Sequence, residues 1–215
     1  MRTRVKICGI TRIEDALAAA RAGADAIGLV FWPKTPRVVS FEQAKNIVAF
    51  LPPFVTVVGL FVDPHADEVR ASLAAVALDM LQFHGNEPAE FCRQFARPYL
   101  KAVPAKPRGD LLQYAARYPD AHGLLFDAHV PGGMPGGTGR SFDWSMIPND
   151  LPRPLVLSGG LTAENVGSAV KQVRPWAVDV STGVEAVDAE GRPRRGIKDF
   201  AKIAAFIEEV RNADV

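Results

Sequence analysis

The chain has 215 residues, 48% hydrophobic and 23% charged, a composition typical of one globular domain that folds without a disulfide or metal. The formal net charge is +1 and no basic run is interleaved with aromatic residues, which argues against a nucleic-acid-binding surface. The sequence contains no signal-peptide pattern and no apolar run of membrane-spanning length, so we expect neither export nor a membrane partner.

The two cysteines lie in different predicted contexts. Cys8 ends the first apolar run, whereas Cys92 lies in a helical segment. A structural disulfide between them is not expected, and free thiols fit a reducing cytoplasm. Composition leaves both a monomer and a homodimer open.

Short apolar runs recur along the whole chain and predict strands that are buried on both faces, as in a parallel sheet. The predicted strands are Val5–Cys8, Ala26–Phe31, Val55–Phe61, Met80–Phe83, Tyr99–Ala102, Gly123–Asp127, Leu155–Ser158 and Ala177–Val180.

Amphipathic segments between these runs predict helices. The first should start at a capping box formed by Thr11 and Glu14 and end at Gly23, and Ser40 should cap the second. The further predicted segments are Phe41–Leu51, Ala66–Val76, Ala89–Ala96, Asp110–Tyr118, a short one in Ser141–Asn149, Ala163–Val173, and a last helix with a buried stripe of Ile197, Phe200, Ile203, Ile207 and Val210.

Eight alternating units without a long insertion predict an α/β fold, a single-domain (β/α)8 TIM barrel over residues 1–215. The alternative is a doubly wound open sheet, which usually carries a glycine-rich GxGxxG turn after its first strand. Here that turn reads Cys8–Thr11 and lacks the pattern.

In a barrel, the residues that follow the strands gather at one mouth. Cys8, Arg37, His84, Asp127 and Asp179 should therefore line this mouth. By contrast, we expect three helical cations to be solvated, namely Lys45, Arg70 and Lys202.

Glycines follow the seventh and eighth predicted strands. Gly159, Gly160 and Gly183, with the hydroxyl of Ser181, predict a phosphate site, because glycine lets backbone N–H groups approach anionic oxygens. The alternative is that these glycines only form tight turns.

Cys8 and Asp127 are the candidates for proton transfer. Cys8 is either a small buried hydrophobe or a base whose pKa Lys6 and Arg37 lower. Asp127 ends an apolar run, where poor solvation favours the protonated form and a general acid. The alternative role is a cap for the loop that follows, whose Gly- and Pro-rich stretch between residues 129 and 141 is either a cover for the site or disordered.

Three further residues are candidates for binding substrate. Arg37 pairs with a substrate carboxylate or is a surface charge; His84 contacts substrate or hydrogen-bonds a neighbouring strand. Asp179, a charge inside an apolar strand, should bind a substrate hydroxyl or amine, or else form a structural ion pair. The other histidines show no metal-site spacing, so we expect no metal.

Taken in order, these residues resemble the phosphoribosylanthranilate isomerase family of tryptophan biosynthesis. The residues that carry the resemblance are Lys6–Thr11, Gly23–Gly28, Pro33–Arg37, Gln82–Gly85, Gly136–Gly139 with Phe142–Trp144, Ser158–Leu161 with Asn165–Val166, and Val178–Glu185. The family often has Leu where Phe83 stands and Ser where Thr182 stands, two mild departures.

The resemblance implies an Amadori rearrangement of N-(5-phosphoribosyl)anthranilate without a cofactor. It makes Asp127 the general acid that opens the ribose ring and Cys8 the general base that removes the C2 proton. It places Arg37 near the anthranilate, Asp179 near the substrate amine, and the phosphate at the last two strand-end turns.

Three rival functions remain open at this point. An isomerase of histidine biosynthesis is expected to have aspartate at position 8 and two similar phosphate-binding halves. The indole-forming lyase of the tryptophan pathway is expected to show lysine and glutamate pairs at strand ends, and these are not found. A non-catalytic phosphosugar-binding barrel is opposed by the presence of both Cys8 and Asp127.

Overall fold

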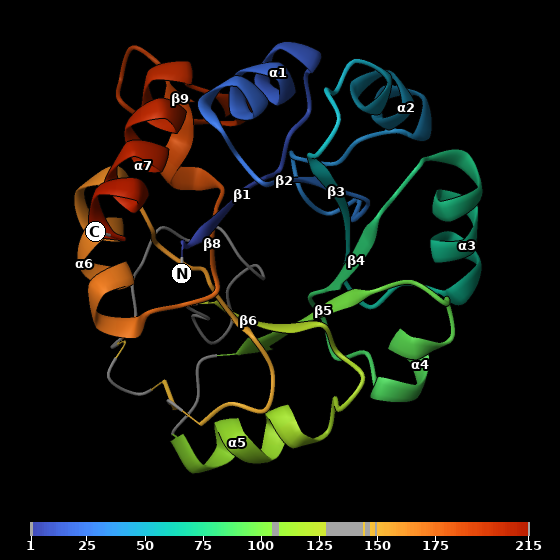
Figure 1. Ribbon diagram of the computed structural model, residues 1–215. Helices are drawn as coiled ribbons and strands as arrows, with labels where there is room; N and C mark the ends of the chain where they lie inside the picture. Colours follow the sequence, from blue (N-terminus) through green and yellow to red (C-terminus); the bar gives the residue numbers. More distant parts are fainter. Residues whose placement is uncertain (1, 105–107, 128–143, 145–146, 149, 215) are drawn as a thin grey trace.

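The computed structural model describes residues 2–104, 108–127, 144, 147–148 and 150–214 (Figure 1). Eight parallel strands form a closed barrel in the order β1 to β8, and β1 pairs with β8 to complete it. The helices lie around the outside of this ring (Figure 1). The predicted barrel is therefore confirmed. The predicted loop of residues 129–141 lies outside the described residues, as does most of the predicted short helix of residues 141–149.

All eight predicted strands are present, and their ends differ from the predicted ends by two residues at most. They are β1 Arg4–Cys8, β2 Ala26–Val30, β3 Thr56–Phe61, β4 Met80–Phe83, β5 Tyr99–Pro104, β6 Gly123–Asp127, β7 Leu155–Leu157 and β8 Ala177–Val180.

Side chains alternate between the inside and the outside of the barrel, as the pleat of a strand requires. Leu100 and Ala102 on β5 pack with Leu125, Val156 and Ala177 from β6, β7 and β8 in one interior cluster. The intervening hydrophobic residues of these strands belong to the larger cluster between the strands and the helices. By the same alternation, Lys6 and Cys8 on β1 face inward while Val5 and Ile7 face the helices.

Seven helices are described. They are α1 Ile13–Ala22, α2 Phe41–Ala49, α3 Ala66–Ala75, α4 Ala89–Arg93, α5 Arg108–Ala116, α6 Ala163–Val173 and α7 Phe200–Ala213. Ser40 caps α2 as predicted, accepting a hydrogen bond from the Gln43 amide at 3.1 Å, and Gly23 ends α1 in the left-handed region. Residue 96, the predicted end of α4, has a positive φ, so that helix stops earlier, at Arg93.

The predicted capping box of α1 is wrong. Arg12 is the N-cap residue, and no side-chain hydrogen bond caps the helix. The Thr11 hydroxyl instead donates to the Gly196 carbonyl, and Glu14 pairs with Arg12 at 3.1 Å. The Thr11 hydroxyl, which the local pattern assigned to the helix start, therefore hydrogen-bonds to a segment distant in sequence.

That distant segment is a hairpin which the sequence analysis did not predict. A short 3-10 turn, η2 (Thr182–Val184), follows β8 and leads into the antiparallel strands β9 (Glu185–Val187) and β10 (Pro193–Lys198). Ile197 lies on β10 and not in the last helix, and Phe200 is 51% exposed, so the predicted stripe is wrong at both positions. The buried face of α7 consists of Ile203, Phe206, Ile207 and Val210.

Among the described residues, none of the helices combines the length and the apolar character that crossing a membrane requires.

The two phenylalanines of α7 provide a matched test of this packing. Phe206 is fully buried, whereas Phe200 is 51% exposed. We expect Phe206→Ala to lower the free energy of unfolding by about 3–5 kcal/mol, because it removes a core ring and leaves a cavity. Phe200→Ala should cost less than about 1 kcal/mol. Denaturant unfolding of both variants measures the difference, and equal losses would show that the face of α7 is wrongly assigned.

Candidate active site

Two adjoining cavities lie where the strands end. The Cys8 cavity, about 60 Å³, is lined by residues that include Cys8, Arg37, Gln82, His84 and Asp127. The Gly183 cavity, about 540 Å³, is lined by Gly159–Glu164, Val180, Thr182, Gly183, Asp199, Ala201, Lys202 and Ala205. Ser158, Asp179 and Ser181 line both. All nine site residues predicted from the sequence therefore line at least one of these two adjoining cavities.

Lys6 links the inward-facing residues of β1 and β8. Its Nζ atom lies 2.8 Å from Asp179 Oδ1, and both side chains are almost completely buried. Burial favours the neutral amine, but the charges of Asp179 and Cys8 outweigh it and raise the pKa of Lys6. Lys6 is therefore a buried ammonium beside the Cys8 thiol.

Burial dominates the titration of Cys8. Desolvation of the thiolate raises the pKa of Cys8 above its ordinary value, although Lys6 acts in the opposite direction. The expectation of a lowered pKa is therefore wrong for the unliganded protein. Lys198 is a second cation that favours the thiolate.

Gly28 makes room for the contact between thiol and ammonium. It lies directly beside Cys8 in the β1–β2 register. A Cβ atom at residue 28 would lie 2.8 Å from Cys8 Sγ and 3.1 Å from Lys6 Nζ. Any larger residue would displace one of the two groups.

Asp127 is held by His84, and His84 by Gln82. His84 Nε2 lies 3.1 Å from Asp127 Oδ2, and Gln82 Nε2 lies 2.9 Å from His84 Nδ1. With the amide donating to Nδ1, the imidazole hydrogen is on Nε2 and points at the carboxylate. Asp127 Oδ1 is buried and has no hydrogen-bond partner in the part of the chain that the structure describes.

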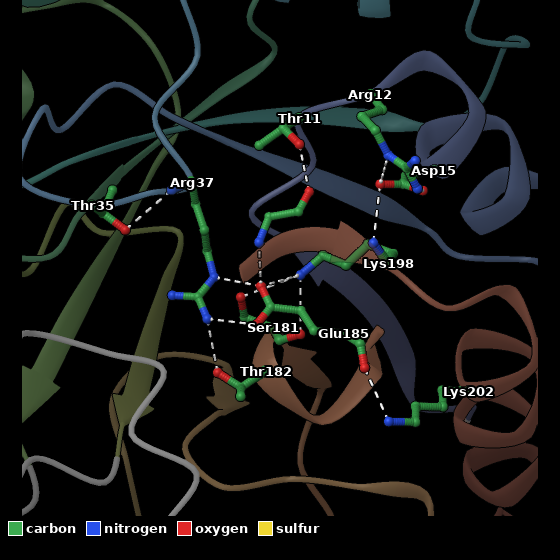
Figure 2. A network of polar contacts seen from close by, with 11 residues as sticks. Thr11, Arg12, Asp15, Thr35, Arg37, Ser181, Thr182, Glu185, Lys198 and Lys202 are labelled. Carbon is green, nitrogen blue, oxygen red and sulfur yellow. Dashed lines mark hydrogen bonds and ion pairs between the residues drawn. The ribbon is translucent and has the colours of Figure 1, made fainter. Parts of the chain in front are cut away.

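Arg37 is buried and paired. Its Nε and Nη2 atoms donate to the two oxygens of Glu185 at 2.7 and 2.9 Å, and Nη2 also donates to the Thr182 hydroxyl at 2.9 Å (Figure 2). It is therefore not a surface charge, one of the two alternatives considered above. The sequence analysis did not identify Glu185 as its partner, because the pairing depends on a hairpin that it did not predict.

Lys198 completes this cluster from the end of β10. Its Nζ atom donates to the Ser181 carbonyl at 3.0 Å and lies 3.4 Å from Glu185 Oε1. Burial lowers the pKa of Lys198 to about 8, against the opposing charge of Glu185. Glu185 is also desolvated, yet its hydrogen bond from Arg37 and the charge of Lys198 lower its pKa, so it is ionised.

The glycine turns form the wall of the Gly183 cavity. Gly159 and Gly160 both have positive φ angles, 89° and 67°, which disfavour any residue with a side chain. A Cβ atom on Gly183 would lie 2.0 Å from the Leu161 carbonyl oxygen, so the turns after β7 and β8 approach at backbone distance. The N-terminus of α6, capped by Thr162 and Asn165, opens onto the same cavity. Backbone N–H groups and a helix N-terminus are a typical anion site.

Lys202 was expected to be solvated, and this is wrong. It is half-buried, donates to the Glu185 carbonyl at 3.0 Å, and lines the Gly183 cavity. Lys45 and Arg70 are exposed as expected. Among the described residues, no group of three or more His, Cys, Asp and Glu side chains could hold a metal ion.

The thiol chemistry can be tested directly. In a Cys92→Ser background, we expect the rate of Cys8 modification by methyl methanethiosulfonate to keep rising with pH beyond 9.0, the ordinary thiol value, because burial raises its pKa. In the converse Cys8→Ala variant, Cys92 should stay unreactive, since burial raises its pKa to about 12. A rate for Cys8 that already levels off near neutral pH would contradict this electrostatic description.

Known proteins are similar to this chain in sequence and share this barrel. The chain matches the family described as PRAI, N-(5'phosphoribosyl)anthranilate (PRA) isomerase, over residues 5–209. It is 59% identical over 209 residues to the N-(5'-phosphoribosyl)anthranilate isomerase of Pseudomonas aeruginosa strain LESB58, which covers 97% of this chain and 95% of the relative.

Solved structures agree with the sequence match. The phosphoribosyl anthranilate isomerase of Thermotoga maritima has a TM-score of 0.87 and 44% identity, covering 98% of this chain and 99% of that one. A phosphoribosyl anthranilate isomerase in complex with reduced 1-(o-carboxyphenylamino)-1-deoxyribulose 5-phosphate has a TM-score of 0.82 and 42% identity, with the same coverage. The chain therefore belongs to the N-(5'-phosphoribosyl)anthranilate isomerase family and is an isomerase of tryptophan biosynthesis.

Proposed function

We propose that this protein converts N-(5-phosphoribosyl)anthranilate to 1-(2-carboxyphenylamino)-1-deoxyribulose 5-phosphate, with Asp127 as general acid and Cys8 as general base. The observation that carries the assignment is that both side chains line the Cys8 cavity, although they come from β6 and β1. This Amadori rearrangement needs one proton delivered to oxygen and one removed from carbon.

Asp127 is suited to deliver the first proton. Asp127 Oδ1 is buried and has no hydrogen-bond partner among the described residues, so a substrate contact at this atom would offset the cost of its burial. The acid proton passes to the ribose ring oxygen as the C1–O bond breaks and its electron pair moves to that oxygen. C1 and the amine nitrogen then form an iminium, and the hydrogen bond from His84 holds the carboxylate that remains.

Cys8 is placed to remove the second proton. The thiolate takes the proton from C2, the C–H electrons form the C1–C2 double bond, and the iminium electrons return to nitrogen. The resulting enolamine becomes the ketone when C1 gains a proton and the C2 hydroxyl loses one. Lys6 assists this step because its charge favours the thiolate.

The remaining predicted residues receive roles in binding. Asp179 lines both cavities and is proposed to accept a hydrogen bond from the substrate amine. Arg37 is proposed to face the anthranilate carboxylate through Nη1, since Nε and Nη2 are already engaged by Glu185 and Thr182. His84, predicted as a substrate contact, is proposed to act through Asp127.

The phosphate is proposed to bind in the Gly183 cavity, to Gly159, Gly160, Ser181 and Gly183. This cavity meets the Cys8 cavity at Ser158, Asp179 and Ser181, so an anchored phosphate would place the ribose between acid and base. Binding energy from a group remote from the reacting carbon then contributes to orienting it. The free thiols fit the proposed location in a reducing cytoplasm.

Turnover of freshly prepared phosphoribosylanthranilate tests the reaction. Cys8→Ala and Asp127→Asn should each lower kcat/KM by about 10²-fold or more, because each removes a proton-transfer group. Loss of anthranilate fluorescence and identification of the product measure this.

Matched controls are available for both variants. Cys92→Ser changes a buried cysteine at α4, and Asp79→Asn changes an exposed aspartate before β4, so both should keep wild-type turnover. If wild-type protein left this substrate unchanged, the phosphoribosyl substrate of histidine biosynthesis would be tested next, and then a non-catalytic binding role.

Gly183→Ala tests the phosphate site. The added methyl group has no room against the Leu161 carbonyl, so the two turns must separate. We expect KM to rise by about 10- to 100-fold, which corresponds to losing hydrogen bonds to a charged group. Gly167→Ala on α6 is the control, since its nearest neighbour would lie at 3.6 Å. Phosphate bound elsewhere would leave the Gly183→Ala variant with an unchanged KM.

A further inference from the structure

Lys198 is a buried cation beside both cavities to which the proposed chemistry assigns no role. Its side chain has no solvent exposure. The ammonium donates to the Ser181 carbonyl at 3.0 Å, and its nitrogen lies 3.4 Å from the Ser181 hydroxyl oxygen. Ser181 lines the Cys8 cavity and the Gly183 cavity alike, so Lys198 contacts the residue where the two meet.

Two hydrogen bonds to carboxylates fix the hairpin backbone at and next to Lys198. The backbone amide of Lys198 donates to Asp15 Oδ2 on α1 at 3.1 Å, and the Gly196 amide donates to Glu185 Oε1 at 2.9 Å. Figure 2 shows Lys198 between Asp15 on one side and Ser181 with Glu185 on the other. The ammonium is therefore held in place before any substrate binds.

The buried charges around Lys198 do not balance. Below about pH 8, where Lys198 is protonated, Arg37 and Lys198 carry two positive charges, whereas Glu185, which contacts both, carries one negative charge. The neighbouring Lys6–Asp179 pair is neutral by itself. A surplus buried cation is costly unless it serves an anion. The proposed reaction involves three anions, namely the anthranilate carboxylate, assigned above to Arg37, the substrate phosphate and the Cys8 thiolate. The last two belong to the cavities that meet at Ser181, the residue that Lys198 contacts.

We propose that Lys198 is a positioning residue of the isomerase, which fixes Ser181 for the phosphate and supplies the surplus positive charge that stabilises the Cys8 thiolate. The phosphate part rests on the proposed function, whereas the effect on the thiolate holds in the unliganded protein. Lys198 favours the thiolate electrostatically, together with Lys6 and against Asp179.

The first experiment reads Cys8 without substrate. In the Cys92→Ser background, Lys198→Met should raise the pKa of Cys8 further and slow its modification by methyl methanethiosulfonate at pH 7, where Lys198 is largely protonated, by about three- to tenfold, since one pKa unit is a tenfold change in thiolate. Lys45→Met, the same change at an exposed site on α2, should leave the rate unchanged. A lysine that only supports the fold would not shift this titration.

The second experiment separates the charge from the hydrogen bond. Lys198→Met should raise KM, and the inhibition constant of inorganic phosphate, by about 10- to 100-fold. Lys198→Gln keeps an N–H donor for Ser181 but no charge, so it should recover part of the phosphate affinity while Cys8 stays as slow to react as in Lys198→Met. If Lys198→Met does not fold, the rate of Cys8 modification in the Lys198→Gln variant decides whether the charge of Lys198 stabilises the thiolate.

The outcomes distinguish the two proposals. Unchanged Cys8 reactivity together with unchanged phosphate inhibition in a folded Lys198 variant would overturn the positioning role. Absence of turnover by the wild-type protein would overturn the proposed function, while the Cys8 titration would still decide whether Lys198 stabilises the thiolate.

Discussion

The pairing of β1 with β8 is the constraint on which the site depends. This pairing closes the barrel and places Lys6 directly opposite Asp179 in the register. Because side chains alternate along a strand, Cys8, two residues after Lys6, faces the same interior. A slip of β1 by one residue would turn Lys6 and Cys8 outward between the strands and the helices, away from Asp179. The strand pairing that closes the barrel therefore also assembles the surroundings of the proposed base.

Closure of the barrel buries several groups that act on the pKa of Cys8 in opposite directions. Burial favours the neutral thiol, and Asp179 adds to this, whereas Lys6 and Lys198 favour the thiolate. The unliganded balance lies on the side of the thiol. A substrate amine that donates to Asp179 would weaken its effect on Lys6 and on Cys8, so binding of the substrate and activation of the base are coupled in the proposed mechanism.

The sequence predicts those features whose signal is local or repeated. Eight apolar runs identify eight strands, and the residues that end or follow each run identify the mouth, so Cys8 and Asp127 could be found without coordinates. The Glu185–Lys198 hairpin could not, because β10 carries exposed charged residues and no clear alternation. Residues of this hairpin contact Arg37, Ser181 and Thr11. These contacts join residues that are separated in the chain, so no local periodicity of the sequence predicts them.

The buried polar atoms without partners show where stability is given up for function. Of the four such atoms in the described part of the chain, Gln82 Oε1 and Asp127 Oδ1 flank the same histidine, His84. A fold optimised for stability alone would pair or remove them, since each unmade hydrogen bond in the interior is costly. Under the proposed mechanism, a substrate that hydrogen-bonds to Asp127 Oδ1 would offset this cost while it receives the acid proton, so recognition and chemistry would use the same oxygen.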